Sequence, residues 1–214
     1  MSLKHSAVCV YLLVTGHGLT GCGGSQTARE LEPIHVIGRT AGGEMRAELI
    51  TADDLFEAAQ TAISQATSPG GCDDAATNVQ RIASEFPESR WLSPALYNLG
   101  LCYKNWSQNE SAYAQFQRLV RLRPDSPDVE DAQFQMLSLA HRLERFSEVR
   151  VLAATVLQRD HLTPDDRMEA LSRRAFAELA MRENEAARAT ADEALRYFRT
   201  RPVESQVTDL SFPA

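Results

Sequence analysis

The sequence predicts an all-α protein built from about four stacked helical hairpins. Three observations lead to this fold class. Apolar residues recur three to four positions apart over most of the chain, as on one face of an amphipathic helix. The same pattern returns after 37 residues, which is typical of stacked supersecondary units. No stretch shows the pattern of a convincing strand.

The first 21 residues are typical of a secretory signal. Lys4 lies in a short N-terminal segment, and an apolar core follows at residues 7–14. Small residues come after the core, and the apolar stretch ends at Cys22. Such a signal is removed and does not belong to the fold. A buried N-terminal helix is the alternative, but the glycines that follow the core disfavour it, because each costs a helix about 1 kcal/mol.

The tetrapeptide Leu19-Thr20-Gly21-Cys22 resembles the lipobox of bacterial lipoproteins. The resemblance implies that Cys22 carries a thioether-linked diacylglyceryl group, that the signal is cut just before it, and that the new amino group is acylated with a fatty acid such as palmitate. Several acyl chains anchor a protein stably, whereas one binds only marginally. In that family, Gly23 after the cysteine implies the outer membrane of a Gram-negative cell.

Residues 22–50 predict a flexible tether that begins at the lipidated N-terminus. This stretch contains glycine pairs and no clear periodicity, with a short extended piece at His35–Arg39. Cys72 and Cys102 are the cysteines of the mature chain after Cys22. A compartment outside the cytoplasm favours a bridge between them. Two free thiols are an equal alternative, because the spacing does not fix their distance.

The repeat domain is expected over residues 51–199, followed by a tail over residues 200–214. Thr51 is suited to cap the first helix, the segment Thr67–Gly71 breaks the helical pattern, and Pro87 ends the second helix. We expect eight helices, over residues 51–66, 73–86, 91–105, 109–122, 128–143, 146–159, 165–182 and 185–199.

The central unit, residues 95–124, resembles a tetratricopeptide repeat (TPR). Small residues at two signature positions let the two helices approach closely, and larger residues fill the gaps beside them. The packing signature consists of Leu99, Gly100, Tyr103, Ala112, Phe116 and Pro124. The resemblance implies a right-handed superhelix of helix-turn-helix hairpins. The stretch "IASEFPESRWLSPALYNLGLCY" further resembles the repeats of bacterial envelope lipoproteins of the BamD and CpoB (YbgF) type.

In TPR proteins, the first helix of each repeat lines a concave surface. Mapped onto this chain, the resemblance yields a set of aromatic, polar and basic groove candidates. They are Tyr97, Leu101, Lys104, Asn105, Phe134, Ser138, His141 and Arg142. We hypothesise that the two large aromatic residues anchor a partner segment and that the cations meet its acidic groups. The alternative is that the aromatic residues belong to the core between repeats and the charges form a solvated face.

Composition and motifs argue against several function classes. The formal net charge of -7 disfavours nucleic acid and anionic membrane surfaces as main partners. The chain has no motif typical of a nucleophile, a phosphate loop or a zinc site. Paired acids at residues 53–54, 73–74 and 165–166 lie at expected helix starts, where they stabilise the helix dipole. We therefore expect no enzymatic activity, cofactor, metal or small-molecule substrate.

Together these patterns predict a lipoprotein on the periplasmic face of the outer membrane that binds periplasmic or outer-membrane proteins. The expected function is that of a scaffold or accessory subunit of an envelope machine. Three machines compete: outer-membrane protein assembly, a secretin, pilus or motility complex, and division or peptidoglycan coordination. A structural lipoprotein that links the outer membrane to peptidoglycan is the alternative.

Overall fold

The computed structural model describes residues 35–39, 45–48 and 50–200. The predicted signal, the lipidation site at Cys22 and nearly all of the C-terminal tail lie outside these residues. The elements are β1 (His35–Arg39), β2 (Met45–Glu48), α1 (Ala52–Ser64), α2 (Gly70–Glu85), α3 (Leu92–Asn105), α4 (Asn109–Leu122), α5 (Asp128–Arg142), α6 (Phe146–Leu157), α7 (Pro164–Ala180) and α8 (Asn184–Arg199). None of the described helices combines the length and apolar character needed to cross a membrane.

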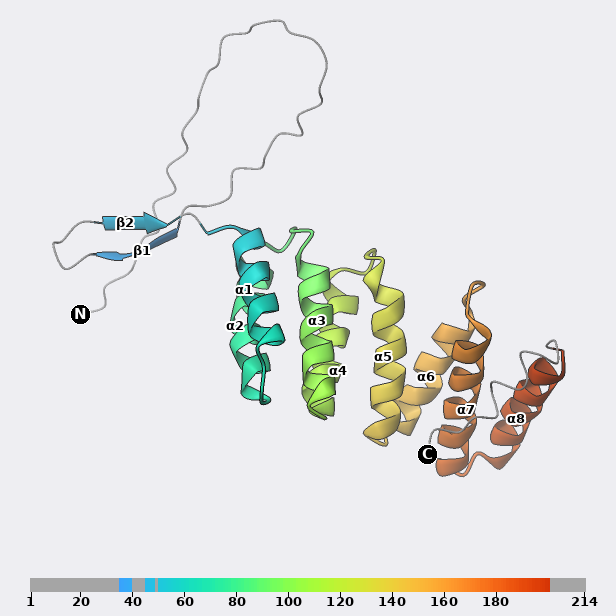
Figure 1. The fold of residues 1–214 in the computed structure, drawn as a ribbon. Coiled ribbons are helices and arrows are strands. Elements are labelled where there is room, and N and C mark those ends of the chain that lie inside the picture. Colours follow the sequence, from blue (N-terminus) through green and yellow to red (C-terminus); the bar gives the residue numbers. More distant parts are fainter. Residues whose placement is uncertain (1–34, 40–44, 49, 201–214) are drawn as a thin grey trace, which may run out of the picture. The chain divides into compact units, whose positions relative to one another are not determined.

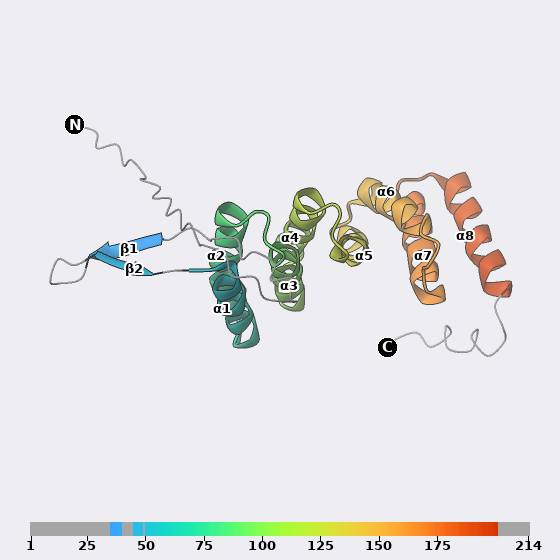
Figure 2. The same ribbon diagram turned by 90° about the horizontal axis from the view of Figure 1, so that it is seen from above.

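Residues 51–199 form the predicted array of helical hairpins. The helices pair in chain order as α1–α2, α3–α4, α5–α6 and α7–α8, and in both views α3 lies beside α4 (Figure 1; Figure 2). The first helices of successive hairpins also contact one another, α1 with α3, α3 with α5 and α5 with α7. Each hairpin therefore buries its apolar surface against its neighbours, as in a repeat protein.

A two-stranded sheet corrects the expectation that the chain has no strand. β1 coincides with the extended piece expected at His35–Arg39, and it pairs with β2 in antiparallel register, His35 opposite Glu48 and Arg39 opposite Met45. The register shifts between Val36 and Gly38. Strands of five and four residues are too short for an alternating pattern to stand out in the sequence, which is why β2 was not predicted.

Helix α2 begins three residues earlier than predicted. The predicted break separates the two helices at residues 65–69, but it ends earlier than expected, because Pro69 has φ of -53°, which is compatible with the start of a helix. Gly71 lies inside the first turn. A Cβ at this position would lie 2.5 Å from the Cβ of Ala66, closer than real side chains approach. Glycine is therefore required here by the close approach of the end of α1, and it does not interrupt α2.

Two of the three acidic pairs contribute caps as predicted. Thr51 and Asp54 form a capping box at the start of α1, in which the Asp54 amide donates to Thr51 Oγ1 over 3.1 Å and the Thr51 amide donates to Asp54 Oδ2 over 2.9 Å. The bonds to Thr51 hold the pKa of Asp54 below its usual value. At α7, the Asp166 amide donates to Thr163 Oγ1 over 3.1 Å.

Other acids of these pairs join one helix to the next, which the capping prediction missed. The Tyr103 hydroxyl on α3 donates to Asp73 Oδ1 on α2 over 2.8 Å. Burial raises the pKa of Tyr103 to about 12, and the bond to Asp73 contributes to the shift. The Trp91 indole donates to Asp53, while its ring stacks on Phe56 with centroids 4.4 Å apart. These acids thus accept hydrogen bonds from aromatic side chains as well as lying near helix starts.

The core of the second hairpin contains the predicted TPR signature. Leu99, Gly100, Tyr103, Ala112 and Phe116 are buried, whereas Pro124 is exposed in the turn before α5. A Cβ on Gly100 would lie 2.7 Å from Cζ of Phe116. The Phe116 ring therefore occupies the space beside the glycine, and this close approach fixes how α3 and α4 pack.

A disulfide joins Cys72 on α2 to Cys102 on α3, which decides between the two alternatives left open by the sequence. The two Cα atoms are 5.8 Å apart, within the usual range for a bridge. Both cysteines are buried. The bond therefore crosses from the first hairpin to the second and ties them together covalently.

We expect Gly100→Ala to destabilise the fold by about 1–2 kcal/mol, because overpacking against Phe116 exceeds the gain in helix propensity. Gly70→Ala is the matched control, since the nearest atom to its Cβ would be Ser68 Oγ at 3.5 Å. Urea unfolding of both variants measures the difference. Equal free energies of unfolding for the two variants would contradict the packing described here.

Reduction of the disulfide is expected to lower the free energy of unfolding by about 3–4 kcal/mol, the value for closing a loop of this length. The two cysteines are separated by 30 positions in the sequence. Thermal unfolding with and without reductant measures this loss. A Cys72→Ala/Cys102→Ala variant should be insensitive to reductant, and a large reductant effect in that variant would point to another cause.

Candidate protein-binding surface

The eight predicted groove residues lie on α3 and α5, the first helices of the second and third hairpins. Their exposure is uneven. Ser138 is buried, and Asn105 and Arg142 are exposed. The remaining five are half-buried: Tyr97, Leu101, Lys104, Phe134 and His141. Three apolar members of this set, Tyr97, Leu101 and Phe134, pack against the core and still keep part of their surface open. These side chains therefore belong in part to the core, and binding of a partner by their exposed part stays a prediction.

Tyr97 connects this surface to the core of the second hairpin. Its ring meets Phe116 edge to face, with centroids 5.5 Å apart. The pKa of the Tyr97 phenol is raised by burial and by the nearby charge of Asp131, while a hydrogen bond with Gln135 opposes the shift. Tyr97 thus has a fixed ring position and a polar tip, two properties that favour aromatic residues at interfaces.

Lys104 crosses from α3 to α5 and binds a neutral partner there. Its ammonium donates to Gln135 Oε1 over 2.6 Å. The pKa of Lys104 is lowered by burial and then by the positive charges of Arg142 and Arg173, whereas Glu169 acts in the opposite direction. Arg142 on α5 and Arg173 on α7 thus both act on Lys104 of α3. We call Lys104, Arg142 and Arg173 the cationic strip.

Helix α7 adds two residues that the sequence analysis did not predict, Arg173 and Phe176. Phe176 is 51% exposed and meets the His141 ring edge to face, with centroids 4.8 Å apart. The ring of Phe146, at the start of α6, also lies near Phe176, with centroids 6.0 Å apart. We call His141, Phe146 and Phe176 the aromatic cluster. It lies where α5, α6 and α7 meet.

A sequence signal for these two residues exists, but it is shifted by one position. The second and third units are related by 37 residues, whereas the fourth follows the third by 38. Applied to Gln135 and Ser138, this longer step leads to Arg173 and Phe176. The slippage falls in the connection before α7. The mapping of the groove from the sequence covered only the second and third units, so it did not include the fourth unit's contribution to the surface.

His141 is the titratable group of the aromatic cluster. Burial lowers its pKa below the ordinary value of 6.5, and the positive charge of Arg173 lowers it further. Its Nδ1 is buried and has no hydrogen-bond partner among the described residues. The ring is therefore neutral at neutral pH and presents an unsatisfied polar atom beside the half-exposed Phe176.

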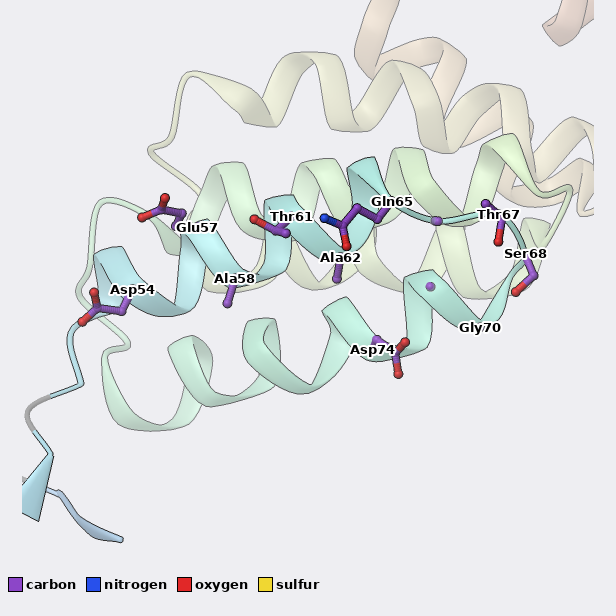
Figure 3. Close-up of a pocket in the computed structure, with 12 residues that line it drawn as sticks. Asp54, Glu57, Ala58, Thr61, Ala62, Gln65, Thr67, Ser68, Gly70 and Asp74 are labelled. Carbon is purple, nitrogen blue, oxygen red and sulfur yellow. The ribbon is translucent and has the colours of Figure 1, made fainter. Parts of the chain in front are cut away.

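A separate depression lies elsewhere in the described part of the chain, between α1 and α2. It has a volume of about 880 Å³, and Figure 3 shows Ala58 and Ala62 pointing from α1 toward α2. Its lining includes small and acidic side chains: Ala58, Ala62, Gly70, Asp54, Glu57 and Asp74. When the buried Leu55 is aligned with the buried Leu96, Ala62 corresponds to Tyr103, which contacts the preceding hairpin. The first hairpin thus has a small, polar outer face, as expected of a terminal unit, and we do not assign a site there.

Comparisons with known proteins identify the fold. No protein-family model matches the chain, and no curated protein matches it. A solved structure described as MamA aligns with a TM-score of 0.50 and 14% identity, over 70% of this chain and 80% of that chain. A structure described as "Podosopora anserina putative kinesin light chain nearly identical TPR-like repeats" aligns with a TM-score of 0.50 and 15% identity, over 68% of this chain and 74% of that chain. The fold is TPR-like. Such folds commonly serve as protein-interaction scaffolds.

The TPR-like fold places the cationic strip and the aromatic cluster on the first helices of consecutive hairpins, except for Phe146, which begins a second helix. Such an arrangement can hold a segment of another protein across several repeats. In the described part of the chain, no group of three metal-binding side chains comes together.

We expect the pKa of His141 to rise when Arg173 is replaced by glutamine, because one of the two causes of its depression is removed. NMR titration of the imidazole measures this shift. The folded state binds the His141 proton less readily than the unfolded state does, so stability should fall as the pH drops below about 6.5. Arg188→Gln on α8 is the control and should leave the His141 titration unchanged. An unshifted pKa in Arg173→Gln would contradict the proximity of the two side chains.

Proposed function

We propose that this chain is a non-enzymatic scaffold, anchored in the outer membrane through a lipid on Cys22, that holds proteins of a periplasmic envelope machine. The observation that carries the proposal is the exposed surface of aromatic and cationic side chains along the first helices of a TPR-like array. The protein serves as an accessory subunit of one of three machines: the machinery of outer-membrane protein assembly, a secretin, pilus or motility complex, or the division machinery.

Two features support the envelope location. The lipobox-like sequence ends on Cys22, after a short apolar core. The buried disulfide between Cys72 and Cys102 fits an oxidising compartment, because structural disulfides are rare in the reducing cytosol. The periplasm is such a compartment. The membrane attachment and the repeat fold together would hold the binding surface close to the outer membrane.

The anchor is tested by metabolic labelling with a palmitate analogue. The full chain should incorporate the label, and Cys22→Ser should lose both the label and its outer-membrane fractionation, because no acyl acceptor remains. Cys9→Ser is the matched control, since Cys9 lies within the predicted signal and should leave the label in place. Label retained in Cys22→Ser would overturn the proposed attachment atom.

The scaffold is tested by crosslinking the full chain in cells and identifying the captured proteins by mass spectrometry. A defined periplasmic or outer-membrane partner should be lost in a Tyr97→Ala/Phe134→Ala/Arg142→Ala variant, because two anchors and one cation are removed. The identity of that partner selects among the three machines. Leu122→Ala/Val151→Ala is the control, since both residues are exposed on second helices.

One outcome favours the structural alternative. If the captured set contains only peptidoglycan and lipid neighbours and does not change in the triple variant, the surface has no part in partner binding. The chain would then be a linker between the outer membrane and the cell wall. Thermal unfolding of the triple variant ensures that a lost partner reflects lost contacts and not a lost fold.

A further inference from the structure

The cationic strip is unusual in a chain with a formal net charge of -7. Lys104, Arg142 and Arg173 come from α3, α5 and α7, the first helices of three successive hairpins. These helices contact one another in order. The protein therefore concentrates positive charge across its repeats at one place, although acidic side chains outnumber basic ones in the sequence.

The cations of the strip are incompletely neutralised. Several arginines elsewhere pair with a carboxylate, such as Arg150 with Glu183 over 2.8 Å. In the strip, Lys104 donates to the neutral Gln135 over 2.6 Å. Arg142 is exposed and has no ion pair among the described residues. Arg173 pairs with Glu169 over 2.6 Å, and the same carboxylate acts on Lys104.

Like charges held this close carry an electrostatic cost. Lys104 loses basicity through burial and then through repulsion by Arg142 and Arg173, with only Glu169 opposing. An anionic group placed among the three cations would relieve this repulsion and gain charge-assisted hydrogen bonds. The strip is therefore suited to bind a negatively charged group of another molecule.

An apolar contact lies directly beside the strip. Phe176 is half-exposed and is supported by His141 and Phe146. The cluster and the strip adjoin, because His141 directly precedes Arg142 on α5 and Phe176 follows Arg173 by three residues on α7. A half-exposed ring in contact with two others can receive an apolar or aromatic side chain at little cost in conformational entropy. The surface thus combines an anion-binding part with an apolar anchor point.

We propose that the cationic strip and the aromatic cluster together bind an acidic segment of a partner protein that also carries an aromatic or aliphatic side chain. This inference rests on the proposed scaffold function and names the chemistry of the partner. Neighbouring helices lie about 10 Å apart, so a segment that crosses from α3 to α7 spans about 20 Å, or about six extended residues. Its carboxylates face Lys104, Arg142 and Arg173, and its apolar side chain lies on Phe176.

A peptide selection tests the proposal and does not require that the partner be identified first. Randomised 12-residue peptides are selected on the purified full chain and on a Lys104→Glu/Arg142→Glu/Arg173→Glu variant. The native chain should enrich acidic peptides that contain an aromatic or aliphatic residue, and the variant should enrich basic ones. The control variant, Arg188→Glu/Arg196→Glu/Arg199→Glu on α8, carries the same change in net charge and should still enrich acidic peptides.

The best acidic peptide then serves as a defined probe in fluorescence anisotropy. Arg142→Gln/Arg173→Gln should raise its dissociation constant by about tenfold or more, and added salt should weaken binding. Phe176→Ser should weaken the same peptide but not a version that lacks the apolar residue. Far-UV circular dichroism of each variant confirms that it is folded.

Three outcomes overturn the inference: no enrichment, enrichment without a charge bias, or the same acidic pool on the native chain and on the strip variant. A neutral, apolar pool that depends on Tyr97 and Phe134 would also overturn it, yet leave the scaffold function standing. Loss of the scaffold function itself is recognised separately, by the absence of a variant-sensitive partner in the crosslinking experiment.

Discussion

The packing of Phe116 against Gly100 is the contact on which the second hairpin depends. Because no Cβ occupies that position, the Phe116 ring fits between α3 and α4, and the edge of Tyr97 rests on the same ring. Tyr97 in turn belongs to the predicted partner surface. The interior of the hairpin thus determines where an exposed side chain is held, so the repeat core and the binding surface are parts of one packing arrangement.

Much of the fold was predictable because helical periodicity and helix caps are local properties of the sequence. All eight helices were found, with ends displaced by at most a few residues. Features that depend on distances between residues in the folded structure were not predictable in this way. The start of α2 depends on the contact between Gly71 and Ala66, and the disulfide depends on a short distance between Cys72 and Cys102. The assignment of β2 depends on its pairing with another strand.

The candidate surface was predicted in part for a related reason. The repeat spacing pointed to residues of α3 and α5, but it could not tell whether Phe134 is buried or open, since its exposure depends on the adjacent hairpins. Phe134 is half-buried, and Ser138 is covered. The contribution of Arg173 and Phe176 was missed because the mapping of the groove stopped at the third unit. The fourth unit matches the repeat pattern only weakly and carries an extra residue.

The bond between Cys72 and Cys102 also changes how the chain responds to mechanical force. Tension applied between the two ends of the polypeptide passes from one cysteine to the other through sulfur, so the residues between them carry no load. Most of α2 and most of α3 lie inside this shielded loop. The third and fourth hairpins have no described covalent link of this kind, so they would extend under pulling while the shielded segment stays intact.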